Sequence, residues 1–126
     1  MSVVTSRPAT AGDIAFFYPN LCATVRAWII ELDGIAVGVI GIALSRPSHS
    51  IFSTFDEALR PHLRSMAIMR TIKRLEGYVE RARGPVLAVR ERNERQSVHI
   101  LKRLGFRFYA IVDGDAVYRY EGGAHG

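Results

Sequence analysis

The clearest pattern of apolar and polar positions lies in residues 24–46 (TVRAWIIELDGIAVGVIGIALSR), where apolar residues first alternate with polar ones and then form a continuous run. Asp33-Gly34 separates the two arms, and this pair supplies the positive φ angles that a two-residue hairpin turn requires. The second arm is apolar on both faces, as a central strand covered by helices would be. Gly38 and Gly41 inside it indicate a bulge or a close backbone approach. We therefore predict a β-hairpin whose second strand lies in the middle of a sheet.

Shorter strand patterns lie on either side of this hairpin. Val3-Val4 opens the chain in an extended pattern, residues 50–55 (SIFSTF) alternate between apolar and polar, and residues 85–91 (PVLAVRE) form a short apolar run. Residues 106–120 repeat the hairpin pattern around Asp113-Gly114-Asp115. Together these segments predict a sheet of about six or seven strands.

Two helices are predicted from the residues at their ends. The first begins after Thr10, which fits an N-cap because Asp13 follows three residues later in the arrangement of a capping box. This helix must be short, because Pro19 interrupts it. The second is a long helix with Pro61 in its first turn, where the missing N–H costs nothing. It is expected to end near Ala82, because a Gly-Pro pair follows.

A third helix is predicted over residues 93–106 (NERQSVHILKRLGF). This segment starts with polar residues, continues with apolar residues spaced three and four apart, and stops at a glycine that an aromatic residue follows at once. Gly105 is expected to end the helix in a left-handed conformation, which allows Phe106 to turn back onto the sheet.

The predicted elements follow the order strand, short helix, hairpin, strand, long helix, strand, helix, hairpin. A strand, a helix and a second strand form a parallel crossover unit, whereas the hairpins add antiparallel neighbours. We therefore predict an α/β fold with a mixed central sheet flanked by helices. The 126 residues have room for one compact domain, which we assign to residues 1–121, and residues 122–126 are expected to be a flexible tail.

Composition bears on the partner more than on the fold. Lys and Arg total 17 against 12 Asp and Glu, and the formal net charge of +5 favours an anionic partner such as nucleic acid, an acidic lipid surface or a phosphate-rich small molecule. Cys22 is the only cysteine, so no internal disulfide is possible, and no Cys/His cluster suggests zinc. The chain lacks a signal-peptide pattern, and its longest apolar run, residues 35–44, is about half the length of a membrane-spanning helix. We expect a cytoplasmic protein.

The order of the elements and the segment 93–106 together resemble the GCN5-related N-acetyltransferases. In that family the late helix commonly reads Asn, a small residue and an apolar stretch, and it ends in Leu-Gly-Phe before the last hairpin. Here these positions are Asn93, Ser97, Ile100-Leu101 and Leu104-Gly105-Phe106. The resemblance implies the acyl-CoA N-acyltransferase fold and the transfer of an acetyl group from acetyl-CoA to an amine, without a metal. The first helical region is shorter than is usual in the family, and a compact chain with an aromatic-rich fourth strand resembles the acetyltransferase-like proteins that phages often encode.

The resemblance implies that acetyl-CoA lies where the fourth and fifth strands part, with its diphosphate on backbone N–H groups at the start of the long helix. The family's phosphate-binding loop reads Gln/Arg-x-x-Gly-x-Gly/Ala, and the matching residues here are 60–65 (RPHLRS). Arg60 fits the first position and Ser65 fits the last, whereas Leu63 stands at the central glycine. Arg64 adds a second guanidinium group beside the helix start. These four residues are therefore candidate cofactor-binding residues.

Further polar residues are assigned through the same resemblance. Asn93 and Ser97 occupy positions with which the family contacts the pantetheine arm, and their alternative roles are a helix cap and a polar surface residue. Tyr109, Tyr118 and Tyr120 of the last hairpin are expected to pack on the sheet instead of donating protons.

The catalytic groups are less closely specified. Many family members carry a tyrosine four residues before the Leu-Gly-Phe glycine that can protonate the leaving thiolate, and here that residue is Leu101. The general base is expected to be a carboxylate or a chain of waters, and the candidates are Glu57, Asp56 and Glu31. His62, inside the phosphate-binding segment, has the chemistry of an acid or a base. We take Glu57 and His62 as the candidate catalytic residues.

Two other hypotheses stay open. Because Leu63 and Leu101 replace two functional positions, the chain is alternatively a catalytically degenerate protein of this fold with a structural or interaction role. The Arg-rich segment 64–83 motivates a nucleic-acid-binding hypothesis, although its basic residues surround the helix instead of forming one stripe. The sequence does not specify the acceptor amine, leaves a homodimer open and predicts no membrane partner.

Overall fold

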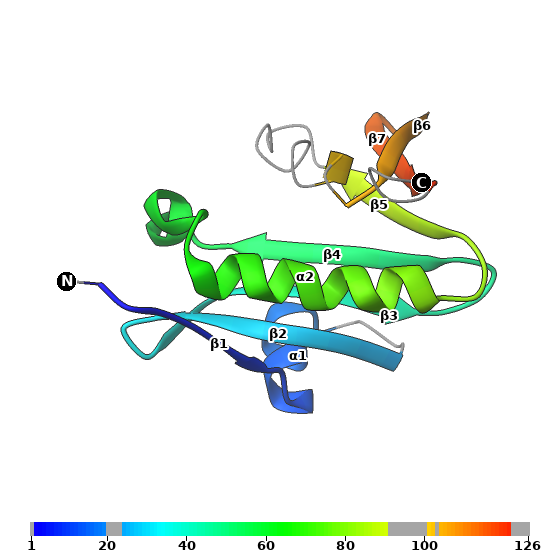
Figure 1. Cartoon of the computed structure of the whole chain (residues 1–126). Coiled ribbons are helices and arrows are strands. Elements are labelled where there is room, and N and C mark those ends of the chain that lie inside the picture. Colours follow the sequence, from blue (N-terminus) through cyan, green and yellow to red (C-terminus); the bar gives the residue numbers. More distant parts are fainter. Residues whose placement is uncertain (1, 20–23, 91–100, 103, 122–126) are drawn as a thin grey trace.

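The described residues form a mixed sheet of seven strands, shown in Figure 1. The computed structural model describes residues 2–19, 24–90, 101–102 and 104–121. Neighbouring strands pair antiparallel except β4 and β5, which are parallel. This arrangement confirms the predicted α/β fold. In order across the sheet, the strands are β1 (Val4–Pro8), β2 (Thr24–Leu32), β3 (Ile35–Leu44), β4 (His49–Phe55), β5 (Val86–Arg90), β7 (Asp115–Tyr120) and β6 (Phe106–Val112).

Both predicted two-residue hairpins are present. Asp33 and Gly34 join β2 to β3 with φ angles of 52° and 84°, and Asp113 and Gly114 join β6 to β7 with the same two values. The bulge predicted in the second arm of the first hairpin is also present, because the register of β2 against β3 shifts and leaves Val37 without a partner residue. Local turn chemistry therefore sets the register of both antiparallel ends of the sheet.

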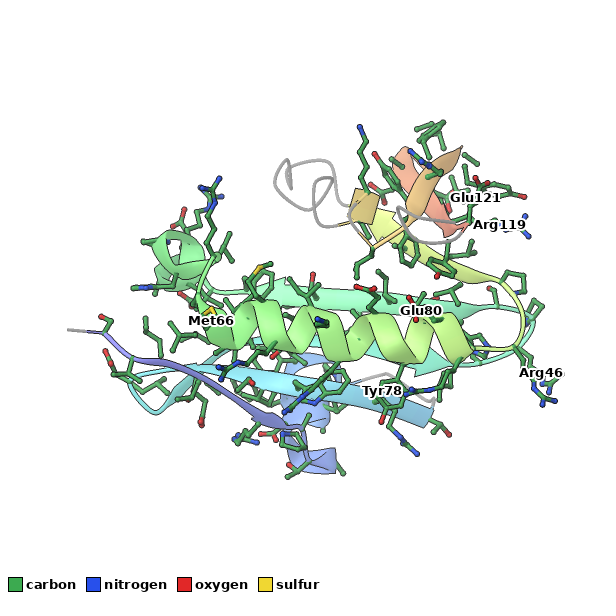
Figure 2. The ribbon with its side chains drawn as sticks, in the orientation of Figure 1. Arg46, Met66, Tyr78, Glu80, Arg119 and Glu121 are labelled. Carbon is green, nitrogen blue, oxygen red and sulfur yellow. The ribbon has the colours of Figure 1, made fainter. Side chains whose placement is uncertain are left out.

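Helix α2 (Met66–Arg81) covers one face of the sheet, which we call the α2 face (Figure 1). Figure 2 shows Tyr78 on the side of this helix that points toward β2, and its ring centroid lies 5.7 Å from that of Trp28. Among the helices of the described residues, none has the length and apolar character needed to span a bilayer. The core between helix and sheet includes Trp28, Ile30, Ile40, Ile42, Ile68, Ile72, Leu75 and Val79.

Helix α1 (Ala11–Phe17) lies on the opposite face, behind β2 in Figure 1, and we call this the α1 face. Thr10 is its N-cap and exchanges hydrogen bonds with Asp13, so the predicted capping box is confirmed. The Asp13 carboxylate also accepts two hydrogen bonds from the Arg7 guanidinium, at 2.7 and 3.1 Å, and Arg7 Nε donates to Glu31 at 3.3 Å. These bonds attach α1 to β1 and β2. The Arg7 guanidinium and the Thr10 N–H hold the pKa of Asp13 well below its usual range.

The long helix begins later than the sequence predicts. Pro61 does not lie in its first turn but inside a separate 3-10 helix, η1 (Glu57–His62). Helix α2 begins at Met66 after the N-cap Ser65, whose hydroxyl accepts the N–H of Ile68 at 3.4 Å. A serine cap stabilises a helix start more than a proline does, because its side chain satisfies a backbone donor that would otherwise have no partner. The predicted end of the helix near residue 82 is correct.

Gly38 and Gly41, where the sequence predicts a bulge or a close backbone approach, allow side chains of β4 to lie directly against β3. A Cβ atom at Gly41 would lie 2.6 Å from the Cβ atom of Ala27 and 2.8 Å from Cζ of Phe52. A Cβ atom at Gly38 would lie 2.8 Å from Cδ1 of Phe55. At both positions an aromatic ring of β4 occupies the space that a side chain would fill. These two glycines therefore allow the β4 side chains to pack against β3.

We expect Gly41→Ala to lower the free energy of unfolding by about 1–3 kcal/mol, because the added methyl group overlaps backbone and core atoms that have no room to shift. The matched control is Gly77→Ala, in the middle of α2, where the nearest atom to an added Cβ lies 3.6 Å away. This control should raise the free energy of unfolding by about 0.5–1 kcal/mol, because alanine favours a helix. Urea denaturation measures both, and a Gly41→Ala variant at least as stable as the wild type would contradict the account of Gly41.

We expect the stabilising effect of Asp13 to depend on pH. Because its pKa is lower in the folded protein than in the unfolded chain, its contribution is complete above the ordinary aspartate pKa of about 4 and is lost as the pH falls through the folded value. The difference in free energy of unfolding between wild type and Asp13→Asn should therefore be constant near neutral pH and shrink below about pH 4. Asp113→Asn, in a turn that asparagine accepts, is the control. A difference that grows on acidification would contradict the ion-pair account.

Candidate active site

The two strands at the centre of the sheet part after three pairs of residues. β4 pairs with β3 as far as Phe55, but it pairs with β5 only from His49 to Ile51. In Figure 1, β5 leaves the side of β4 and the two strands diverge toward η1 and the first turn of α2. The predicted divergence is therefore present. The backbone N–H and C=O groups on that side of residues 52–55 are not paired with β5, so they are positioned to bind an extended ligand.

Packing with different neighbours keeps the diverging ends apart. The end of β4 lies against β3, because the Phe55 ring fills the space over Gly38 and the fully buried Leu59 of η1 packs beside it. β5 pairs instead with β7 over residues 87–90. Each strand thus has its own partner where the two separate.

At the other end, His49 fastens β4 to β5. Its backbone N–H donates to the carbonyl of Pro85 at 2.9 Å, and its ring lies between two loops. Nδ1 accepts the N–H of Ser45 at 3.2 Å, so Nε2 carries the proton and donates to the Arg83 carbonyl at 2.7 Å. We call this pairing region the closed end of the gap. Sequence reasoning did not identify His49, since its two partners are remote along the chain or lie in a loop.

The segment predicted to hold a diphosphate lies between the end of β4 and α2, at the open end of the gap. Arg60 and Arg64 are exposed, and Arg60 makes a 3.9 Å ion pair with Glu57 that is too solvated to contribute much stability. Ser65 caps α2, so its hydroxyl group is used within the helix. Arg60 and Arg64 thus both lie in the segment directly before the 16-residue helix α2, although no described contact places their guanidinium groups at its first N–H groups.

The backbone at Leu63 does not adopt the left-handed conformation that a glycine allows. Its φ and ψ angles of −63° and −17° are right-handed, and no residue from 57 to 65 has a positive φ angle. Its side chain is half-buried and packs against the hydrophobic core. A 3-10 helix thus connects β4 to α2, and part of the Leu63 side chain is buried against the core.

The candidate acid and base groups have different surroundings. Glu57 has 85% of its side chain exposed, and His62 is half-buried in the same short helix, η1. Asp56 caps η1 by accepting the N–H of Ala58 at 2.9 Å. Glu31 makes an ion pair with Arg7 on the α1 face of the sheet. The structure therefore does not bring Glu31 together with Glu57, His62 and Asp56. Among the described residues, no three His, Cys, Asp or Glu side chains form a group that could hold a metal ion.

The late helix is only partly described. Asn93 and Ser97 lie outside the described residues, whereas Leu101 is buried in the core with 6% exposure. Gly105 has a φ angle of 96°, and its N–H donates to the carbonyl three residues earlier at 3.1 Å. Phe106 is fully buried. The predicted left-handed glycine and the return of the aromatic side chain to the sheet are confirmed.

The tyrosines of the last hairpin differ in exposure. Tyr118 is buried in the core and Tyr120 packs against it, but Tyr109 is 58% exposed. Burial raises the pKa of Tyr120, and the nearby carboxylates of Glu80 and a second glutamate of α2 raise it further. Figure 2 shows Glu80 on the side of α2 opposite Tyr78.

Three residues on the α1 face join α1 to the diverging part of β4. The hydroxyl group of Tyr18 is hydrogen-bonded to that of Thr54, and its ring meets Phe52 edge to face with 5.0 Å between centroids. Sequence reasoning missed this contact. The alternation in residues 50–55 places 52 and 54 on one face, but nothing in the sequence pairs that face with the end of α1.

No protein-family model and no curated protein sequence matches the chain, but solved structures do. The ribosomal-protein-S18-alanine N-acetyltransferase from Escherichia coli is similar with a TM-score of 0.64 and 10% identity, over 97% of this chain and 97% of that one. The GNAT domain of S. lividans PAT is similar with a TM-score of 0.62 and 12% identity, over 91% and 88%. An acetyltransferase from Agrobacterium tumefaciens is similar with a TM-score of 0.57 and 20% identity, over 86% and 65%.

These similarities define the fold class. The chain has the acyl-CoA N-acyltransferase fold of the GCN5-related N-acetyltransferases, as predicted. It spans 65% of the length of the Agrobacterium tumefaciens acetyltransferase.

We expect His49→Ala to loosen the closed end of the gap and to lower the free energy of unfolding by about 1–3 kcal/mol, because two hydrogen bonds are lost. Ser50→Ala, at the next and exposed position of β4, is the control and should change little. Urea denaturation gives the free energies, and hydrogen exchange of the residue 49 N–H reports the closed end directly. Unchanged exchange in the His49→Ala variant would show that the side chain does not fasten the two strands.

Proposed function

We propose that the protein is a GCN5-related N-acetyltransferase that transfers an acetyl group from acetyl-CoA to an amine. The observation that carries this proposal is the divergence of β4 and β5 toward the N-terminus of α2. The fold supports it, because the similar structures include acetyltransferases from several bacteria. In the reaction the amine nitrogen bonds to the thioester carbonyl carbon, the carbon–sulfur bond breaks, the amine loses a proton and the CoA thiolate gains one.

The surroundings of the gap suit the binding of acetyl-CoA. Arg60 and Arg64 supply guanidinium groups for phosphate, and the first N–H groups of α2 together with the helix dipole favour an anion at the same corner. The side of residues 52–55 that no described part of β5 pairs with offers backbone donors and acceptors to the amide groups of the pantetheine arm. Asn93 and Ser97 are assigned to the same arm through the resemblance.

The proton transfers are assigned to groups at the open end of the gap. Glu57 and His62 are the proposed acid and base candidates, since both lie on η1 directly after β4. Leu101 has no hydroxyl group and is buried, so the thiolate must receive its proton from another group or from water.

A catalytically degenerate protein is the second candidate, and the observation that favours it is the pair Leu63 and Leu101. Under this hypothesis the wild-type chain acetylates no amine, and the leucine at position 63 prevents the diphosphate from approaching the helix. A Leu63→Gly variant that binds acetyl-CoA when the wild type does not would favour this candidate over the enzyme.

We expect the wild-type protein to bind acetyl-CoA in isothermal titration calorimetry. The double variant Arg60→Ala, Arg64→Ala should bind about tenfold more weakly or worse, because each charge-assisted hydrogen bond to phosphate contributes more than a neutral one. Arg74→Ala, an exposed arginine further along α2, is the matched control and should retain the wild-type affinity. Absence of binding by the wild type at millimolar acetyl-CoA would overturn the proposed function.

A further inference from the structure

The structure shows which basic residues of the segment 64–83 share one side of α2. The opposite side of the helix, which includes Ile72 and Leu75, is buried against the sheet. Because successive residues turn by about 100° around a helix, the exposed basic residues fall within about a third of its circumference. They therefore form one stripe, contrary to the expectation from the sequence. This basic stripe consists of Arg70, Lys73, Arg74 and Arg81, all of which are exposed.

The positive charge of the basic stripe is not neutralised within the described part of the protein. No member of the stripe makes an ion pair with another described residue. Arg70 lies three residues from Lys73 and four from Arg74, and like charges at these spacings repel each other on a helix. Glu80, which Figure 2 shows on the side of α2 opposite Tyr78, borders the stripe without pairing with it. An anionic partner that bound here would remove this repulsion.

Two features of the stripe suit close contact with a phosphate group. Gly77 lies between the basic residues and has no side chain, so a ligand can approach the helix there, and the nearest atom to an added Cβ is Nη1 of Arg81 at 3.6 Å. The Arg81 guanidinium lies over the Tyr78 ring, 5.2 Å from its centroid, and that ring contacts Trp28. A guanidinium held in this way loses less conformational freedom on binding, and its planar donors match the oxygens of a phosphate.

The spacing of the charges favours a nucleic-acid duplex over an acidic peptide. From residue 70 to residue 81 the stripe extends over about 16 Å, since each helical residue adds about 1.5 Å. One strand of a duplex places about five phosphates along that length, which is enough for every basic residue of the stripe. An extended acidic peptide presents a side chain to one surface only every 7 Å or so, which supplies about three carboxylates.

Two other anionic partners fit the stripe less well. A helix that binds a bilayer surface inserts large apolar side chains, but apart from Met66 at its first position those of α2 are buried or half-buried against the sheet. Single-stranded nucleic acid is held largely by bases that stack on exposed aromatic rings. Tyr78 cannot serve in this way, because Arg81 and Trp28 contact its ring.

We propose that the basic stripe of α2 binds the phosphate backbone of a nucleic-acid duplex without reading its base sequence. Contacts to phosphates fix position but carry no sequence information, which comes from the edges of the bases. The inference goes beyond the proposed acetyl transfer and does not depend on it, because the stripe lies along the side of α2 and the proposed diphosphate site lies at its N-terminus.

The direct test measures binding of the full chain to a fluorescent DNA duplex of two helical turns by anisotropy. If four phosphates are neutralised, the Kd should rise about a hundredfold between 50 and 200 mM salt, because each contact releases counterions. Duplexes of unrelated sequence should bind equally, and an RNA duplex of the same length shows which of the two sources of phosphate is preferred. Absence of binding at the lower salt concentration, or a Kd that does not depend on salt, would overturn the inference.

A matched pair of variants locates the contact. Arg70→Gln with Arg74→Gln removes two charges from the stripe, and glutamine favours a helix about as well as arginine. The slope of log Kd against log salt should fall by about 2 in this variant. Arg107→Gln with Arg119→Gln removes the same charge from exposed positions of the last hairpin and should keep the wild-type slope. Equal losses in the two folded variants, as judged by circular dichroism, would show that net charge alone causes the binding and would overturn the assignment.

Competition distinguishes the duplex from the other anionic partners. Unlabelled duplex should displace the fluorescent duplex at a lower concentration of negative charge than poly-glutamate or vesicles made of equal parts of phosphatidylserine and phosphatidylcholine. Stronger displacement by poly-glutamate or by the vesicles, lost in the Arg70→Gln, Arg74→Gln variant, would assign the stripe to an acidic protein or to a membrane and would overturn the inference.

Discussion

The chemistry proposed for this protein depends on one constraint: β4 is bound to β3 along its length but to β5 over only three residue pairs. A parallel pair that continued would close the sheet and leave no free edge near α2. Instead, the side chains at the end of β4 pack on β3, whereas β5 pairs with β7. The two strands therefore have different neighbours where they separate. The separation is therefore a consequence of packing. Among the described residues it leaves the β5 side of residues 52–55 without a strand partner near a helix N-terminus, and an extended anionic ligand needs both features.

Two absent side chains make this arrangement possible. Gly38 admits the Phe55 ring on the α2 face and Gly41 admits the Phe52 ring on the α1 face, so both faces of β4 are fixed by aromatic groups that lie across β3. On the α1 face, Tyr18 at the end of α1 packs edge to face on Phe52, so this contact attaches the end of α1 to β4. The ion-pair cluster around Arg7 holds the other end of that helix. The short first helix is thereby fixed at both ends.

Sequence patterns predicted the parts of the structure that local chemistry decides. Asp33-Gly34 and Asp113-Gly114 specify their turns through their own φ angles, and Thr10 with Asp13 specifies a helix start through two local hydrogen bonds. Pro61 was misplaced because proline suits the first turn of an α-helix and a 3-10 helix alike, and the stronger cap at Ser65 decided between them. His49 with Arg83 and Tyr18 with Thr54 join residues 34 and 36 positions apart, so no local pattern could have predicted them. The resemblance supplied Arg60 to Ser65 as a segment, but the 3-10 conformation that carries Leu63 toward the core follows from packing alone.

A crystal structure of the protein with bound CoA tests the central claim most directly. The account predicts electron density for the pantetheine arm along residues 52–55 of β4, in the gap beside β5, with the diphosphate within hydrogen-bonding distance of the first N–H groups of α2 and of Arg60 or Arg64. CoA bound elsewhere on the molecule, or a gap in which Leu63 occupies the position of the diphosphate, would contradict it.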